Sequence, residues 1–220
     1  MSDSAVGAAE LASRLLEIGA VVLRPNDPFT WASGMRSPVY CDNRMTLGYP
    51  ALRAGIAAAF VELSGGYAPD RVAGTATAGI PHAAWLADRL DLPMCYVRSS
   101  AKAHGRGNQI EGPLLEGDRV VLVEDLVSTG MSSLAAVRAL EEAGATVEAV
   151  VAIFSYGIPR ATRAFEEAGI RLHTITTFPD LLRAASGAGG LSAADVESLS
   201  EWHADPEAWS EARVRGTETA

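Results

Sequence analysis

Hydrophobic residues follow two alternating patterns over residues 71–178. Short, almost continuous apolar runs are typical of strands buried on both faces of a sheet. Five such runs occur, at 71–74, 93–97, 119–125, 146–156 and 171–178. Three stretches between them carry apolar residues at helical spacing, at 79–90, 132–144 and 159–169. Strands that alternate with helices predict an α/β fold, with a central parallel β-sheet flanked by helices on both faces.

The segments before this region are less regular. Residues 5–18 and 49–63 each place apolar side chains at helical spacing, which predicts two helices. Short extended pieces lie between these helices, at 21–23, 29–33 and 37–42. Proline and glycine separate the pieces, so we expect them to form hairpins.

The C-terminal part follows the last predicted strand. Apolar spacing predicts short helices near 179–186 and 192–202. The residues after His203 are mostly polar. We therefore predict a single domain over 1–202 and a flexible tail over 203–220.

The composition is that of a globular protein, with 220 residues, 48% of them hydrophobic and 20% charged. The net charge of −9 argues against nucleic-acid and anionic-membrane partners, because these need a basic face. Cys41 and Cys95 lie far apart without metal-ligand spacing, so we expect reduced thiols. The sequence also lacks a signal-peptide pattern and a membrane-spanning apolar run. We expect a cytoplasmic protein.

The most informative motif is VVLVEDLVSTGMSS at 120–133. An apolar strand brings Glu124 and Asp125 to its C-terminal end, and a short turn then leads into a helix. Ligands of parallel sheets bind at this edge. Backbone N–H groups of the turn and of the helix N-terminus bind phosphate well, and Ser128 and Thr129 add hydroxyl donors. The carboxylates suit sugar hydroxyls or a metal, so the motif predicts a sugar-phosphate site.

A structural interpretation of the same motif is a strand that ends in solvent-exposed acids before an ordinary helix. Serine and threonine are common helix caps, which favours this alternative. Two consecutive acids between an apolar run and a Ser-Thr-Gly turn are much rarer, and Gly130 permits a close approach of the backbone to an anion. We therefore favour the functional interpretation.

Residues 98–112 are a second unusual segment. Arg98, Lys102, His104 and Arg106 gather positive charge in an acidic chain, and several glycines accompany them. The segment is long for a connection within a compact domain. It predicts a mobile lid that closes over an anionic substrate, with Lys102 and His104 stabilising negative charge on a leaving group or donating a proton. The alternative is a solvated basic loop.

These motifs resemble those of the type I phosphoribosyltransferases, in which the 120–133 pattern is the signature for phosphoribosyl diphosphate (PRPP). The orotate phosphoribosyltransferases are the members in question. Three further stretches carry the resemblance: FTWASGMRSPVYCDNR at 29–44, GTATAGIPHAA at 74–84 and YVRSSAKAHGRGNQIEG at 96–112.

The resemblance implies the type I phosphoribosyltransferase fold: a five-stranded parallel sheet, a mobile catalytic loop and a small hood from about 20–45 and 179–202. It implies transfer of the 5-phosphoribosyl group from PRPP to orotate, giving orotidine 5′-monophosphate and pyrophosphate in de novo pyrimidine (UMP) biosynthesis. Mg²⁺ would arrive bound to the diphosphate. The family's loop reaches into the neighbouring subunit's site, so a homodimer is implied.

The family's site residues transfer to matching positions of this chain. The implied PRPP-binding residues are Thr77, Ala78, Arg98, Lys102, His104, Glu124, Asp125, Leu126, Val127, Ser128, Thr129, Gly130, Met131 and Ser132. The implied catalytic residues among them are Lys102, His104 and Asp125. Ser128 and Tyr40 are implied orotate contacts, although an aromatic residue in a short strand also suits a core. His82, His173 and His203 are interpreted as structural, and the histidine spacing predicts no metal site.

Several positions depart from the family pattern. Lysines that are common in the family are replaced by Ala32, Ala78 and Ser99. Met131 stands where a small residue is commoner. An arginine that binds the orotate carboxylate in those members aligns near Tyr156. Arg36 and Arg160 are both candidates to replace that arginine, and the sequence does not separate them.

Three other functions are weighed against this one. A phosphoribosyltransferase for uracil or a purine would share 120–133 but would not need the 29–44 hairpin or the KAHGRGNQIEG loop. A PRPP-sensing regulator would need a DNA-binding module or a basic RNA-binding face. A dinucleotide oxidoreductase would need a GxGxxG motif before a helix, and the chain has none.

Overall fold

The computed structural model describes residues 4–30, 34–100 and 109–218. Its centre is a six-stranded sheet with the order β10-β9-β8-β5-β6-β7. Neighbouring strands run parallel, except that β7 pairs antiparallel with β6 at one edge. The strands are β5 (Arg71–Thr75), β6 (Met94–Val97), β7 (Ile110–Glu111), β8 (Arg119–Val127), β9 (Thr146–Ser155) and β10 (Leu172–Thr177). The predicted five-stranded parallel sheet is confirmed, and β7 extends it.

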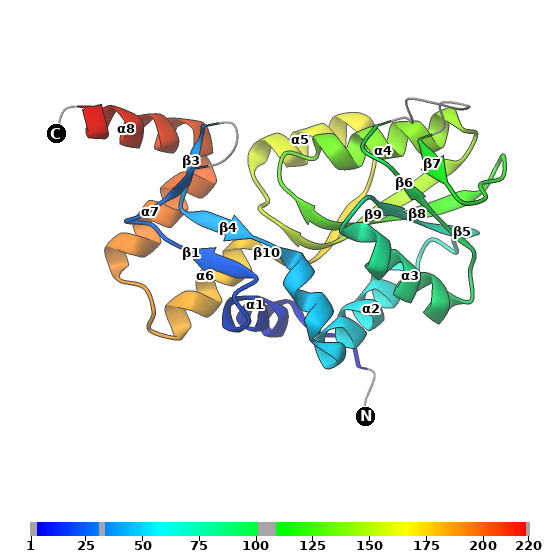
Figure 1. The fold of residues 1–220 in the computed structure, drawn as a ribbon, viewed down its shortest axis with the longest axis horizontal. Coiled ribbons are helices and arrows are strands. Elements are labelled where there is room, and N and C mark those ends of the chain that lie inside the picture. The colour runs from blue at the N-terminus through cyan, green and yellow to red at the C-terminus, as the bar shows by residue number, and fades with distance from the viewer. Residues whose placement is uncertain (1–3, 31–33, 101–108, 219–220) are drawn as a thin grey trace.

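Helices cover both faces of the sheet (Figure 1). On one face lie α2 (Pro50–Ser64) and α3 (Gly79–Leu90), and on the other lie α4 (Met131–Glu142) and α5 (Pro159–Ala168). Because both faces are covered, the side chains from Val120 to Val123 are fully buried whichever way they point. This is why the β8 segment is continuously apolar in the sequence.

The hood lies on the β10 side of the sheet, at the left of Figure 1. It contains two short antiparallel ladders, β1 (Val21–Leu23) with β4 (Val39–Cys41) and β2 (Phe29–Thr30) with β3 (Arg36–Ser37). Its helices are α1 (Ala8–Glu17), α6 (Phe178–Gly187), α7 (Ala193–Ala204) and α8 (Pro206–Glu218). The 3-10 helix η1 (Asn43–Gly48) connects the hood to α2.

The C-terminal segment differs from the flexible tail predicted over 203–220. Residues Pro206–Glu218 form α8, which packs against β3. The Asp205 carboxylate accepts a hydrogen bond from a backbone N–H of the first turn of α8. Trp209 is buried, and its indole N–H donates to Ser198 of α7 at 3.3 Å. Within the described residues this segment is therefore helical, and both Trp209 and Ser210 attach it to the rest of the hood.

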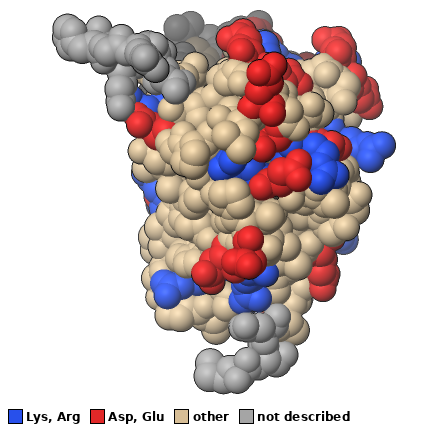
Figure 2. All heavy atoms as spheres, turned by 90° about the vertical axis from the view of Figure 1, so that its right-hand side faces the viewer, with Lys and Arg blue, Asp and Glu red and all other residues tan. Residues whose placement is uncertain are grey.

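Charged residues of both signs are interspersed on the face of the molecule shown in Figure 2. The described residues on that face form no continuous basic area, as a net charge of −9 leads one to expect. Among the described helices, none is both long and apolar enough to cross a membrane.

Candidate functional site

Glu124 lies near the carboxyl end of β8 and is buried. Its carboxylate accepts hydrogen bonds from Thr75 Oγ1 at 2.5 Å and from Ser133 Oγ at 2.9 Å. Burial raises the pKa of Glu124 to about 7; the charge of Asp125 acts in the same direction and the two hydroxyl donors oppose it. Glu124 therefore joins β8 to β5 and to the first turn of α4.

Asp125 is the less buried of the two carboxylates. Its carboxyl group lies next to that of Glu124, and the two interact by a side-chain hydrogen bond. Burial raises the pKa of Asp125, and its hydrogen bonds and the charge of Arg44 offset this only in part. Its backbone carbonyl accepts a hydrogen bond from Asn43 Nδ2 at 2.7 Å, which ties the start of η1 to the end of β8. Asp125 is thus the carboxylate that borders solvent.

The strand continues two residues beyond its predicted end at 125. Val127 pairs with Ser155 of β9, and its carbonyl oxygen accepts a hydrogen bond from the Tyr156 N–H at 3.1 Å. Its side chain is buried, whereas that of Leu126 is half-buried. Pairing with β9 continues as far as Val127, and β8 ends there.

The turn after β8 has a glycine where no other residue fits. Gly130 has φ +80°, and a Cβ atom there would come within 2.9 Å of the Phe165 ring, so glycine is required. Helix α4 starts at the next residue without a side-chain cap, so Ser128 and Thr129 do not fill the capping role weighed as the alternative. The residues of the turn that are at least partly exposed are Ser128, Thr129, Met131 and Ser132.

The second predicted anion-binding turn follows β5. Thr77 is exposed, Ala78 is half-buried, and the Ala76–Thr77 peptide bond is cis. A Cβ atom on Gly79 would lie 2.5 Å from the carbonyl oxygen of Val123, so α3 starts in direct contact with β8. Since β5 and β8 are parallel neighbours, both turns lie at the same edge of the sheet.

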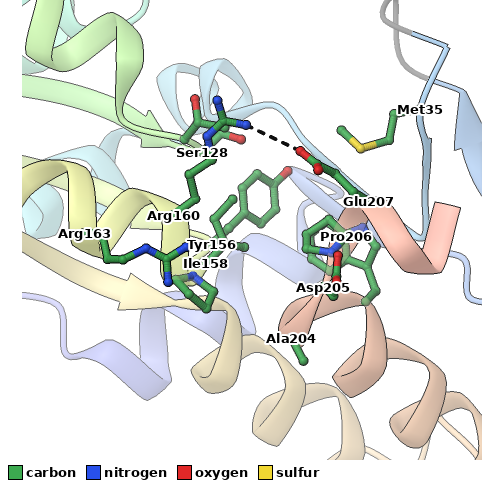
Figure 3. A pocket seen from close by; sticks show the side chains of 13 residues that line it. Met35, Ser128, Tyr156, Ile158, Arg160, Arg163, Ala204, Asp205, Pro206 and Glu207 are labelled. Carbon is green, nitrogen blue, oxygen red and sulfur yellow. Dashed lines mark hydrogen bonds and ion pairs between the residues drawn. The ribbon is translucent and has the colours of Figure 1, made fainter. Parts of the chain in front are cut away.

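A cavity of about 420 Å³ is lined by residues of both the sheet and the hood (Figure 3). The sheet side contributes Ser128, Thr129, Tyr156, Ile158, Pro159, Arg160 and Arg163. The hood contributes Met35, Trp202, Ala204, Asp205, Pro206 and Glu207. Because Ser128 and Thr129 belong to the turn after β8, the cavity adjoins the predicted phosphate site.

Arg160 and Glu207 approach each other across this cavity (Figure 3). Arg160 Nη1 lies 3.4 Å from Glu207 Oε1. Arg36, in contrast, is not among the lining residues, and its backbone N–H donates to Ser210 Oγ of α8 at 2.8 Å. Of the two candidate arginines, the structure brings Arg160 to the cavity that contains Ser128.

The described ends of the basic loop are held together. The Arg98 N–H donates to the carbonyl oxygen of Gln109 at 2.9 Å, and the Arg98 guanidinium lies 3.6 Å from the Glu111 carboxylate. Lys102 and His104 lie outside the described residues, as does Ala32. Their predicted roles stay predictions.

Tyr40 lies on β4 and is 43% exposed. Its ring is 5.5 Å from that of Phe29, within the hood. It is not among the residues that line the cavity, so its contact with orotate stays a prediction.

The described histidines that we interpreted as structural make internal contacts. Burial lowers the pKa of His82 to about 4, so it stays neutral at physiological pH. His173 hydrogen-bonds Tyr67, and His203 hydrogen-bonds the carbonyl oxygen of Tyr156 at 2.8 Å. No cluster of three potential metal ligands occurs within the described ranges.

Most of the residues that line the cavity had no predicted role, among them Met35, Tyr156, Arg163 and Glu207. Tyr156 directly follows an apolar strand at the ligand-binding edge, and this position is a signal that could have singled it out. Glu207 follows an Asp-Pro pair, which is typical of a helix start. Only the packing of α8 brings Glu207 to the cavity.

Comparisons with known proteins agree with this geometry. Residues 48–172 match the family model described as "Phosphoribosyl transferase domain". An orotate phosphoribosyltransferase of Listeria monocytogenes is 55% identical over 202 residues, which cover 91% of this chain and 97% of that protein.

Solved structures give the same picture. Orotate phosphoribosyltransferase from Aeropyrum pernix superposes with a TM-score of 0.71 at 33% identity, covering 83% of this chain and 99% of that one. The Mycobacterium tuberculosis enzyme in complex with PRPP superposes with a TM-score of 0.62 at 28% identity, covering 79% and 97%.

Proposed function

Because this chain belongs to the orotate phosphoribosyltransferase family, we propose how its residues bind two substrates and carry out the transfer. The enzyme transfers the 5-phosphoribosyl group from PRPP to orotate, giving orotidine 5′-monophosphate and pyrophosphate in pyrimidine biosynthesis. One observation carries the assignment of roles: Ser128 belongs both to the turn after β8 and to the cavity lined by two arginines. The phosphate and base sites therefore share a border.

PRPP binds at the carboxyl edge of the sheet. Its 5′-phosphate is bound by the uncapped first turn of α4 and by the hydroxyls of Ser128 and Thr129. Its diphosphate is bound at the turn after β5, beside Thr77 and Ala78. The shared edge of β5 and β8 supports this division, because it brings the two turns to one side of the sheet.

The ribose of PRPP lies against the two carboxylates. Asp125 borders solvent and accepts hydrogen bonds from the ribose hydroxyls. Glu124 is already bound to Thr75 and Ser133, and its remaining lone pairs add a weaker contact. Its main role is to keep the end of β8 and the start of α4 in register.

Magnesium is the metal that suits this site. Mg²⁺ would arrive bound to the diphosphate of PRPP, as the family resemblance implies, and the carboxylate of Asp125 would lie beside it without being a direct ligand. When bound with the diphosphate, Mg²⁺ neutralises charge on the leaving group. The residues of this chain then orient the ribose and exclude water.

The transfer is a displacement at the anomeric carbon of PRPP. The bond from that carbon to the diphosphate oxygen breaks with its electron pair going to pyrophosphate, a ring nitrogen of orotate forms the new bond from the opposite face, and the proton of that nitrogen is released to pyrophosphate or solvent. Asp125 stabilises the positive charge that develops on the sugar. Lys102 and His104 stabilise the departing diphosphate, and Arg98 fixes one end of their loop. Positioning and electrostatics suffice, so no covalent enzyme intermediate is required.

The proposal also covers the oligomeric state and the location of the enzyme. The enzyme is a homodimer whose basic loop serves the neighbouring subunit's site, as the family resemblance implies. It acts in the cytoplasm, which suits its two free cysteines.

The test is the ultraviolet absorbance of orotate mixed with purified protein, PRPP and Mg²⁺, with uracil and hypoxanthine in parallel. We expect a PRPP-dependent loss of the orotate signal, while the other bases stay unchanged. Reaction of another base with orotate untouched would contradict the choice of base. Binding of PRPP without any reaction would support a regulator instead.

A further inference from the structure

The cavity between the sheet and the hood is lined by charged residues of both signs. Four charged residues line it, Arg160 and Arg163 from α5 and Asp205 and Glu207 from the hood. The Asp205 carboxylate is already committed, because it accepts a hydrogen bond from the first turn of α8. Glu207 is different, since it reaches across the cavity to Arg160. Figure 3 shows this pair with the ring of Tyr156 between its two walls.

Resting on the proposed function, we propose that Arg160 binds the carboxylate of orotate, and that Glu207 occupies the same guanidinium when orotate is absent. The chemistry matches, because a guanidinium recognises a carboxylate by charge-assisted hydrogen bonds. Glu207 Oε1 lies 3.4 Å from Arg160 Nη1. The cavity therefore has room for a carboxylate oxygen beside this guanidinium.

The position of Arg160 in the fold supports this role. Arg160 follows Pro159 in the first turn of α5, just after β9 delivers Tyr156 to the cavity. Ser128, which belongs to the phosphate turn, lines the same cavity. A planar base that enters here therefore has the reacting ribose on one side and the guanidinium on the other.

The Arg160–Glu207 pair is also suited to exchange. The side chains are 61% and 74% exposed, so the ion pair is weak and an incoming carboxylate displaces it at little cost. Orotate bound in the cavity would contact Tyr156 and Ser128 as well as Arg160, because both also line the cavity. It would therefore bind more strongly than the Glu207 side chain. Glu207 thus acts as a competitor that keeps the guanidinium in place between turnovers.

The decisive test compares two nucleotides that differ only in the carboxylate: orotidine 5′-monophosphate and uridine 5′-monophosphate. Their dissociation constants are measured by titration calorimetry for the wild type and for Arg160→Gln. We expect the wild type to bind the carboxylated nucleotide at least about tenfold more tightly, the size typical of a hydrogen bond to a charged group. In Arg160→Gln this preference should fall to about twofold or less, with the affinity for uridine 5′-monophosphate unchanged.

Two further variants make the test specific. Arg14→Gln removes an exposed arginine that pairs with Glu17 on α1, and should leave the preference intact. Arg163→Gln should also retain it. If the preference survives in Arg160→Gln, or is lost in Arg163→Gln instead, the assignment of Arg160 is overturned.

The competitor role of Glu207 has its own readout. Glu207→Gln should lower the KM for orotate by about twofold to fivefold and leave the KM for PRPP unchanged, because the exposed ion pair it removes is weak. An unchanged or increased KM for orotate would contradict competition. The proposed function is tested separately, by the wild-type protein: if it does not consume orotate, the function is refuted. The variants test only the roles of Arg160 and Glu207.

Discussion

The sheet half and the hood hold their site residues by different means. Glu124 and Asp125 are placed by the β8–β9 ladder and by buried hydrogen bonds to Thr75 and Ser133. On the hood side, the residues that line the cavity depend on the attachment of α8 through Trp209 and Ser210 and on the exposed ion pair of Glu207 with Arg160. The comparison teaches that the sheet edge at which we propose PRPP binding is held by buried contacts, whereas the hood wall of the cavity depends more on exposed side chains.

The largest effect is expected from Asp125→Asn. The variant keeps the shape of the side chain but removes the charge that faces the ribose, so turnover should fall by about a hundredfold or more. Steady-state kinetics with orotate and PRPP measures this, and the far-ultraviolet circular dichroism should stay that of the wild type. Full activity in a folded variant would refute the role of Asp125.

Trp209→Ala is chosen to destabilise the hood without changing the sheet. The loss of a buried tryptophan should reduce the free energy of unfolding of the part that contains α8 by about 3 kcal/mol. PRPP affinity should be retained, while the KM for orotate rises because the hood wall of the cavity loses its support. Denaturant unfolding and substrate titrations check both. Loss of PRPP affinity would show that the two halves are not separate.

The sheet half is tested by Gly79→Ala. The new methyl group would meet the Val123 carbonyl oxygen at 2.5 Å, so we expect a destabilisation of about 1–3 kcal/mol and weaker PRPP binding. Gly187→Ala is the matched control, because no atom lies within 4 Å of its Cβ position. Equal stability of the two variants would contradict the tight contact of α3 with β8.

A further prediction concerns the pH dependence of stability. Burial raises the pKa of Glu124 in the folded protein to about 7, so the folded state binds this proton more tightly than the unfolded chain, whose carboxyl titrates near 4.3 (roughly). The contribution of Glu124 to stability is therefore complete below about pH 4 and is lost as the pH rises towards 7. Relative to Glu124→Gln, the wild type should lose stability over this interval in denaturant titrations. Parallel pH profiles of the two proteins would contradict the raised pKa.

The sequence predicted the sheet half well because burial on both faces leaves a direct trace, as the continuous apolar run of β8 shows. It also singled out Gly130, whose positive φ the structure confirms. The cavity was not predictable in the same way. Glu207 reaches it through the packing of α8, which Trp209 and Ser210 anchor, and tertiary contacts of this kind leave no periodic pattern. Arg36 and Arg160 could not be separated for the same reason.

The central claim is that PRPP and orotate are bound by different halves of the molecule. Its most direct test is a parallel measurement of the KM for PRPP and the KM for orotate in Arg160→Gln and in Thr77→Ala, with Arg14→Gln as the control. The account predicts that Arg160→Gln raises only the KM for orotate and that Thr77→Ala raises only the KM for PRPP. Equal changes of both constants in either variant would contradict it.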